Sequence, residues 1–190
     1  MVTFDASLTG GGATLSMGNH DDRTVVSFWR TRCTKEDASA PDANFQDPAH
    51  QAAWEAYAML VALTTWGDLF KDPCTVTLRG DAQGVLQGII KGQARSAAIN
   101  LIFAEVQLVL APLALDLTAI HWWSEHNALC DQISRPDVDR EVPGDLKGVQ
   151  EVAPEGVNGT SSDKISASSW VTRRSERGNK EKTFSQQDIL

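Results

Sequence analysis

Residues 2–18, which read VTFDASLTGGGATLSMG, decide the fold class of this chain. Two strands are expected here, at residues 2–6 and 12–18, because both segments combine apolar and small polar residues. The three glycines at 10–12 predict that the chain turns back between the two strands. Asp5 is unexpected, because Asp is a poor strand former. It is either a turn residue that ends the strand or one arm of a metal site that needs further carboxylates elsewhere.

The rest of the chain extends this hairpin into a larger sheet. Further strands are expected at 24–30, 74–80 and 115–122, and helices at 49–70, 82–92, 95–111 and 127–134. This order predicts an α/β fold: a mixed five-stranded sheet with three antiparallel strands first, flanked by helices. Residues 136–190 are rich in Gly, Ser, Pro and charge, without an apolar period. We therefore expect a folded domain at 1–135 and a disordered tail at 136–190.

The composition excludes several classes of protein. A net charge of −8, from 25 acidic and 17 basic residues, disfavours phosphate contacts, so a nucleic-acid function would need metal ions to offset the charge. The three cysteines are an odd number without paired spacing, which argues against a disulfide framework or a zinc knuckle. The sequence has neither a long apolar run nor a secretory signal, so we expect no membrane partner and an intracellular protein, cytoplasmic or nuclear.

Two further carboxylates occupy positions typical of active sites. Glu55 is the single charge in a helix that is apolar almost all round, AAWEAYAMLVALTTWG at 52–67, where it is costly without a partner or a cation. The alternative is that Glu55 lies near the helix start, is favoured by the helix dipole and reaches solvent. Asp81 directly follows the strand CTVTLRG, where α/β folds commonly build their sites, although it could also be the N-cap of the next helix.

A fourth carboxylate, Asp131, lies in the segment HNALCDQISR at 126–135. At helical spacing, Asp131 shares one polar face with Asn127 and Ser134, while the opposite face of the same helix is apolar. This polar face is either an ordinary solvated surface or a part of the same carboxylate site.

The order of the four carboxylates resembles the ribonuclease H domain of retroelement reverse transcriptases, of retrotransposon and retroviral type. That family has Asp, Glu, Asp and Asp at these places on a five-stranded sheet. Four stretches carry the resemblance: Asp5-Ala6-Ser7, Glu55 with Ala58 and Ala62-Leu63, Asp81-Ala82-Gln83, and His121-x5-Asn127-x3-Asp131 running into Ile133-Ser134-Arg135. The second is similar to the family's E-x-x-A-x-x-x-A-L helix, and the last is similar to its H-x5-N-x3-D-x-L-S-R ending. The resemblance covers residues 1–135.

The resemblance implies a metal-dependent endonuclease that hydrolyses the RNA strand of RNA–DNA hybrids. Two Mg²⁺ ions, or Mn²⁺, would stabilise negative charge on the attacking and leaving oxygens. By resemblance, Asp5 would bridge both ions, Glu55 and Asp81 would hold the ion on the leaving-group side, and Asp131 would hold the other. His121 would assist proton transfer and product release. The implied partners are the hybrid and a reverse transcriptase polymerase domain.

Other residues are candidates for contacts to the substrate. Gln83, Asn127 and Ser7 are candidate contacts to the hybrid, whose RNA strand would be recognised through 2′-hydroxyls in a wide minor groove. Trp122 and Trp123 could stack on nucleotides, but a place in the core or as cover for the sheet is the favoured interpretation.

The sequence departs from the family pattern in places, and two alternatives stay open. Ala52 stands where the family usually has Gln, and Ser124 stands in a loop that usually bears glycine. One alternative is a catalytically inactive ribonuclease H-like module that binds nucleic acid or another partner. The other is an integrase-like or exonuclease member of the same superfamily. The retained carboxylates favour an enzyme over the first, and the D-x-I-S-R ending together with the strand–helix order favours ribonuclease H over the second.

Overall fold

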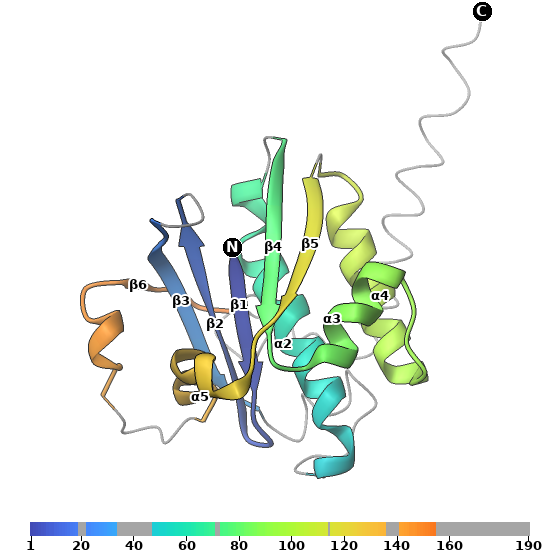
Figure 1. Cartoon of the computed structure of the whole chain (residues 1–190), viewed down its shortest axis with the longest axis horizontal. Helices are drawn as coiled ribbons and strands as arrows, with labels where there is room; N and C mark the ends of the chain where they lie inside the picture. The colour runs from blue at the N-terminus through green and yellow to red at the C-terminus, as the bar shows by residue number, and fades with distance from the viewer. Residues whose placement is uncertain (19–21, 34–46, 71–72, 114, 136–140, 155–190) are drawn as a thin grey trace, which may run out of the picture.

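A computed structural model of the chain describes residues 1–18, 22–33, 47–70, 73–113, 115–135 and 141–154 (Figure 1). The strands are β1 (Val2–Ala6), β2 (Gly10–Met17), β3 (Thr24–Arg32), β4 (Cys74–Gly80), β5 (Leu115–His121) and β6 (Gln150–Glu151). The α-helices are α2 (Gln51–Thr65), α3 (Gln83–Lys91), α4 (Ala97–Leu110) and α5 (Ala128–Ser134). The 3-10 helices are η1 (Pro48–His50), η2 (Gly67–Phe70), η3 (Ser124–His126) and η4 (Gly144–Leu146).

The strands form one mixed sheet in the order β5-β4-β1-β2-β3-β6. Strands β1, β2 and β3 are antiparallel neighbours, whereas β4 runs parallel to β1, and β5 runs parallel to β4. The expected ribonuclease H-like architecture is therefore confirmed: the mixed sheet begins with three antiparallel strands and is flanked by helices. The expected count of five strands was wrong, because β6 adds a sixth strand parallel to β3.

Helices cover both faces of the sheet (Figure 1). Side chains alternate along β1: Val2, Phe4 and Ala6 join the main hydrophobic core with α2, and Asp5 faces α5. Helix α4 packs on α2, α3 lies beside both, and α5 crosses the opposite face over β1, β2 and β3. Because α2 and α5 approach β1 from opposite faces, groups from both helices can meet at the end of that strand.

Helix α2 is buried along most of its length. Every residue from Ala53 to Leu63 is buried, as expected for a helix that is apolar almost all round. Packing of the neighbouring apolar residues carries Glu55 into the interior with them. The alternative in which Glu55 reaches solvent was therefore wrong.

The glycines at 10–12 lie in strand β2, so the prediction that the chain turns there was wrong. The turn precedes them, and the Ser7 amide closes it by donating to the Gly10 carbonyl at 2.8 Å. Gly12 pairs directly with Asp5 across the β1–β2 ladder. A Cβ on Gly12 would lie 2.6 Å from Cγ1 of Ile133 in α5. The missing side chain therefore lets α5 approach the sheet beside Asp5.

Residues 141–154, which we call the C-terminal strap, fall inside the expected disordered tail, and for them that prediction was wrong. Their strand β6 pairs with β3, and Arg30 of β3 forms an ion pair with Glu151 at 3.0 Å. Leu146 is 1% exposed and shares a small core with Phe28 and Ile133. A few apolar residues suffice here because the sheet and α5 already provide an apolar surface to bury them. Residues 136–140 and 155–190 of the expected tail lie outside the described residues.

Candidate active site

The predicted site residues lie at one edge of the sheet. Strands β1, β4 and β5 run parallel, so their carboxyl ends meet at this edge. Asp5 lies near the end of β1, Asp81 directly follows β4, and His121 is the last residue of β5. Open α/β sheets commonly build their ligand sites at this edge.

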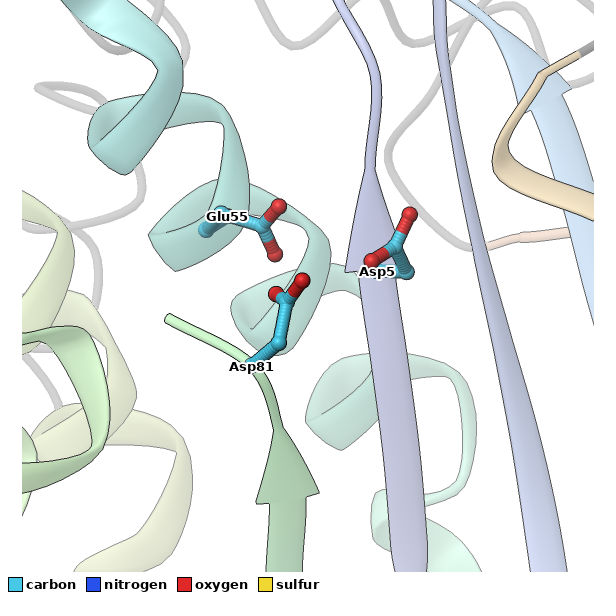
Figure 2. A group of neighbouring side chains, drawn as sticks. All are labelled: Asp5, Glu55 and Asp81. Carbon is cyan, nitrogen blue, oxygen red and sulfur yellow. The ribbon is translucent and has the colours of Figure 1, made fainter. Parts of the chain in front are cut away.

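Three of the four predicted carboxylates come together here. Asp5, Glu55 and Asp81 each offer an oxygen, and these oxygens all lie within 4.8 Å of one another. Figure 2 shows that the carboxylates approach from β1, from α2 and from the segment after β4. Asp5 and Glu55 are each only 4% exposed, whereas Asp81 is half-buried. Three negative charges held so close would repel one another strongly without a cation.

Burial and charge repulsion both raise the pKa values of Asp5 and Glu55. Burial raises the pKa of Asp5 from 3.8 to about 7, a hydrogen bond from Ser134 opposes the rise, and Asp81 and Asp131 add to it. Burial also raises the pKa of Glu55 well above its usual range, and the charges of Asp5 and Asp81 raise it further. A set of ligands made of carboxylate oxygens suits a hard divalent cation such as Mg²⁺ or Mn²⁺.

One oxygen of Glu55 is held by two donors, and the other is buried without a donor in the described part of the chain. Its Oε1 accepts from the Ala6 amide at 3.2 Å and from Nε2 of Gln51 at 3.1 Å. Its Oε2 is buried and has no hydrogen-bond partner among the described residues. A buried carboxylate oxygen without a donor fits a site that takes a cation.

Gln51 is a site residue that the sequence interpretation missed. Its Nε2 also donates to the Ala6 carbonyl at 2.5 Å, so it fixes Glu55 against the end of β1. The resemblance drew attention to Ala52, where the family usually has Gln. Gln51 is the helix neighbour four residues before Glu55, and that spacing is the signal that could have identified it.

Asp5 is fixed by two donors from α5 and the residue before it. Ser134 donates its hydroxyl to Oδ2 at 2.5 Å, and Asn127 donates Nδ2 to Oδ1 at 3.3 Å. Both donors are buried, so on the face that they share with Asp131 these two side chains point at Asp5 and not at solvent. The prediction that Asn127 contacts the hybrid does not fit this burial. Asp5 is a buried residue of β1, so its interpretation as a turn residue was also wrong.

Asp131 lies at the rim of the site. Its Oδ1 accepts from Nη2 of Arg135 at 2.6 Å, and 38% of its side chain is exposed. It is not one of the three residues whose oxygens lie within 4.8 Å of one another, but it is near enough to raise the pKa of Asp5. The solvated-surface interpretation therefore describes Asp131 in part, and its role as a metal ligand stays a prediction.

Asp81 is held by the segment that follows β5. Ser124 donates its hydroxyl to Oδ2 of Asp81 at 2.7 Å, and Nε2 of His121 lies 3.1 Å from the Asp81 carbonyl oxygen. A carbonyl oxygen only accepts, so Nε2 carries the hydrogen, and in the neutral ring Nδ1 is the acceptor. Ala82, and not Asp81, is the N-cap residue of α3. The sequence identified Ser124 only as a departure from the family pattern and did not predict its contact with Asp81.

The remaining candidates lie around this site. Gln83 is exposed at the start of α3, whereas the Ser7 hydroxyl donates to the Ser134 carbonyl at 2.7 Å. Trp122 is half-buried, with the Arg79 guanidinium 3.4 Å from its ring centroid. Trp123 is exposed, so the favoured interpretation as core or cover was wrong for that residue.

Comparisons with known proteins find likeness in structure alone. No family model matches the sequence, and no curated protein matches it. RNase H1 from Halobacterium salinarum is 17% identical, with a TM-score of 0.49 over 70% of this chain and 91% of its own. An N-terminal RNase H domain from Mycobacterium tuberculosis is 13% identical, with a TM-score of 0.48 over 70% and 88%. LC11-RNase H1, solved in complex with an RNA/DNA hybrid, is 15% identical, with a TM-score of 0.43 over 70% and 91%.

Because these identities and TM-scores are low, the description of the fold rests on the strand order of this chain. The description of the site rests on the side chains of this chain. Within the described part of the chain, no helix combines the length and the apolar character needed to cross a membrane.

Proposed function

We propose that this protein is a metal-dependent endonuclease of the ribonuclease H type, which hydrolyses the RNA strand of RNA–DNA hybrids. The observation that carries the proposal is the convergence of Asp5, Glu55 and Asp81 within 4.8 Å, with Oε2 of Glu55 buried and without a donor. A purely structural role does not account for three carboxylates that repel one another in a buried place. The order of the carboxylates along the sequence, and their resemblance to the retroelement domains, support the same conclusion.

The carboxylates would hold the cations. Two Mg²⁺ ions, or Mn²⁺, would stabilise the charge on the attacking and leaving oxygens of the phosphodiester. Asp5, Glu55 and Asp81 are placed to hold a cation together. Asp131 would complete the site for a second ion from the rim, once its carboxylate exchanges Arg135 for that ion. The hydrogen bonds from Ser134, Gln51 and Ser124 keep the oxygens of the three inner carboxylates in place.

His121 would move a proton at the edge of the site. Its Nε2 is directed at the Asp81 carbonyl, which fixes the ring beside the carboxylates. The other ring nitrogen, Nδ1, is then the atom that would take up or give away a proton. This role requires no direct bond from the imidazole to a metal ion.

The retroelement context is part of the proposal. The D-x-I-S-R ending at Asp131–Arg135 resembles retrotransposon domains, so we infer a reverse transcriptase polymerase domain as a partner. A net charge of −8 leaves little electrostatic attraction for a hybrid, and a polymerase domain would supply additional grip. An intracellular location follows from the same context.

A catalytically inactive binding module is the second candidate. The Asp131–Arg135 ion pair favours it, because the fourth carboxylate already has a cationic partner in the absence of metal. The two candidates differ in the outcome of one assay, which is cleavage of a labelled RNA–DNA hybrid with Mg²⁺ and with Mn²⁺.

The assay compares the wild type with Asp81→Asn, which removes one charge at nearly constant shape. Asp116→Asn is the matched control, because Asp116 is an exposed residue near the opposite end of β5. Cleavage by the wild type and Asp116→Asn, lost in Asp81→Asn, supports the nuclease. Metal binding without cleavage by the wild type, even when a polymerase domain is added, supports the inactive module. Cleavage of duplex DNA but not of the hybrid would indicate an integrase-like nuclease instead.

A further inference from the structure

Trp123 exposes an unusually large apolar surface to solvent. Its side chain is 67% exposed, more than any other large apolar side chain in the described part of the chain. The residue is nevertheless well anchored, because its carbonyl accepts from the His126 amide at 2.8 Å and from the Asn127 amide at 3.2 Å. Tryptophan is enriched at surfaces that bind a partner, because its ring is apolar and its N–H can form a hydrogen bond.

The position of Trp123 connects it to the carboxylate site. Its ring lies edge-on against His121, with the ring centroids 4.9 Å apart. His121 contacts the Asp81 carbonyl, and the next residue, Ser124, donates to the Asp81 carboxylate. In the sequence, Trp123 therefore lies between His121 and Ser124, the two residues that contact Asp81. A substrate bound at Asp81 would therefore lie near this indole.

The neighbouring tryptophan is engaged within the protein and serves as a contrast. Trp122 is half-buried, and the Arg79 guanidinium lies 3.4 Å from its ring centroid. That cation–π contact occupies one face of the Trp122 ring. The two tryptophans therefore differ in role: Trp122 covers the sheet, and Trp123 presents its ring to solvent.

Resting on the proposed function, we propose that Trp123 is an apolar platform for a nucleotide of the hybrid beside the cleaved phosphate. An aromatic ring that buries its apolar surface against a nucleotide gives affinity that depends neither on sequence nor on positive charge. Such a contact suits a chain with a net charge of −8, which has few cations to spare for phosphates. In an intact duplex the base faces are already stacked on one another. The indole therefore contacts the sugar edge exposed in the minor groove.

The test measures binding separately from cleavage. The affinity for a labelled RNA–DNA hybrid is measured by fluorescence anisotropy, in a buffer that contains Ca²⁺ in place of Mg²⁺. The proteins compared are the wild type, Trp123→Ala and Trp123→Phe. Leu101→Ala is the control, because Leu101 is 61% exposed on α4, in the helix layer on the other face of the sheet from α5. We expect Trp123→Ala to weaken binding by roughly fivefold or more, because it removes the apolar ring surface that the contact buries, and Trp123→Phe to retain most of the affinity. Leu101→Ala should bind like the wild type.

Salt dependence identifies the kind of contact. Since the indole neutralises no phosphate, Trp123→Ala should lower the affinity by the same factor at low and high salt. Unchanged hybrid affinity in Trp123→Ala would overturn the proposal, even if the wild type cleaves the hybrid. A Trp123-dependent affinity without any cleavage would uphold the platform and count against the nuclease. An equal loss of affinity for single-stranded RNA would overturn the sugar-edge contact, because it would indicate stacking on an unpaired base.

Discussion

Ser134 donates its hydroxyl to Asp5 at 2.5 Å, and this bond joins strand β1 to α5, the last α-helix of the described residues. It connects residues 129 positions apart in the sequence and lies in the interior. The bond fixes the orientation of the Asp5 carboxylate, which faces both the inner carboxylates and the Asp131 rim. The site therefore depends on how α5 sits on the sheet.

Replacing Ser134 tests this dependence. We expect Ser134→Ala to lower the affinity for Mg²⁺ by roughly 10- to 100-fold, the usual effect of removing a group that orients a metal ligand. Isothermal titration calorimetry measures it. Ser96→Ala is the control, since Ser96 caps α4 and its loss costs stability without touching the site. Equal Mg²⁺ affinities for Ser134→Ala and Ser96→Ala would show that the bond does not position Asp5.

Gly12 tests the approach of α5 to the sheet. A Cβ at this position lies 2.6 Å from Cγ1 of Ile133 and 3.0 Å from its backbone carbon, so Gly12→Ala must displace the helix. We expect a loss of about 1–3 kcal/mol in the free energy of unfolding, together with weaker Mg²⁺ binding. Gly84→Ala in α3 is the matched control, because a Cβ there meets nothing within 4 Å. In urea unfolding the control should be at least as stable as the wild type. Similar results for the two variants would contradict the close approach.

The C-terminal strap supports α5 from the side away from Asp5. Leu146 is buried against Ile133 and Phe28, and the strap is held to β3 by strand pairing. We expect Leu146→Ala to lower the free energy of unfolding by about 2–5 kcal/mol, as for other buried leucines. Leu108→Ala, at an exposed position on α4, should change it little. If chemical denaturation finds Leu146→Ala as mild as that control, the strap does not pack as described.

The pH dependence of stability follows from the raised pKa of Asp5. Without divalent cations, the folded protein keeps a proton on Asp5 up to about pH 7, while the unfolded chain releases it near 3.8. The folded state binds more protons in this window, so the free energy of unfolding falls as the pH rises through it. Glu55 acts in the same direction, because its pKa is also raised.

Thermal unfolding in a chelator at a series of pH values measures this fall. Asp5→Asn should flatten it, and Asp116→Asn should leave it as in the wild type. Because a cation competes with these protons, added Mg²⁺ should raise Tm more at about pH 8 than at about pH 5. A slope that is the same in Asp5→Asn and in the wild type would exclude Asp5 as its source.

The strand and helix patterns predicted the mixed sheet, whereas the resemblance in residue order predicted a site of four carboxylates, of which Asp5, Glu55 and Asp81 come together. Asp5 and Asp81 are tied to the ends of strands whose periodicity is strong, and Glu55 is the single charge of an apolar helix. Parallel strands then place these ends at one edge. These features are local in sequence and depend little on the details of packing.

The errors came from features that depend on tertiary contacts. The glycines at 10–12 suggest a turn, but they lie in β2, and Gly12 lacks the Cβ that would collide with Ile133 of α5. The strap contains few apolar residues, and these are stable only because Phe28 and Ile133 offer a surface. The burial of Asn127 and the exposure of Trp123 depend on how α5 and the loop before it dock, which no period in the sequence encodes.

The central claim is that Asp5, Glu55 and Asp81 form a divalent cation site, and calorimetric titration of Mg²⁺ into the wild type and Glu55→Gln tests it most directly. Glutamine keeps the acceptor that Ala6 and Gln51 contact, but it replaces the buried oxygen without a partner by an amide. The account predicts saturable binding at millimolar Mg²⁺ by the wild type and none by Glu55→Gln, which should remain folded and be at least as stable without metal. No binding by the wild type, or equal binding by both proteins, would contradict the account.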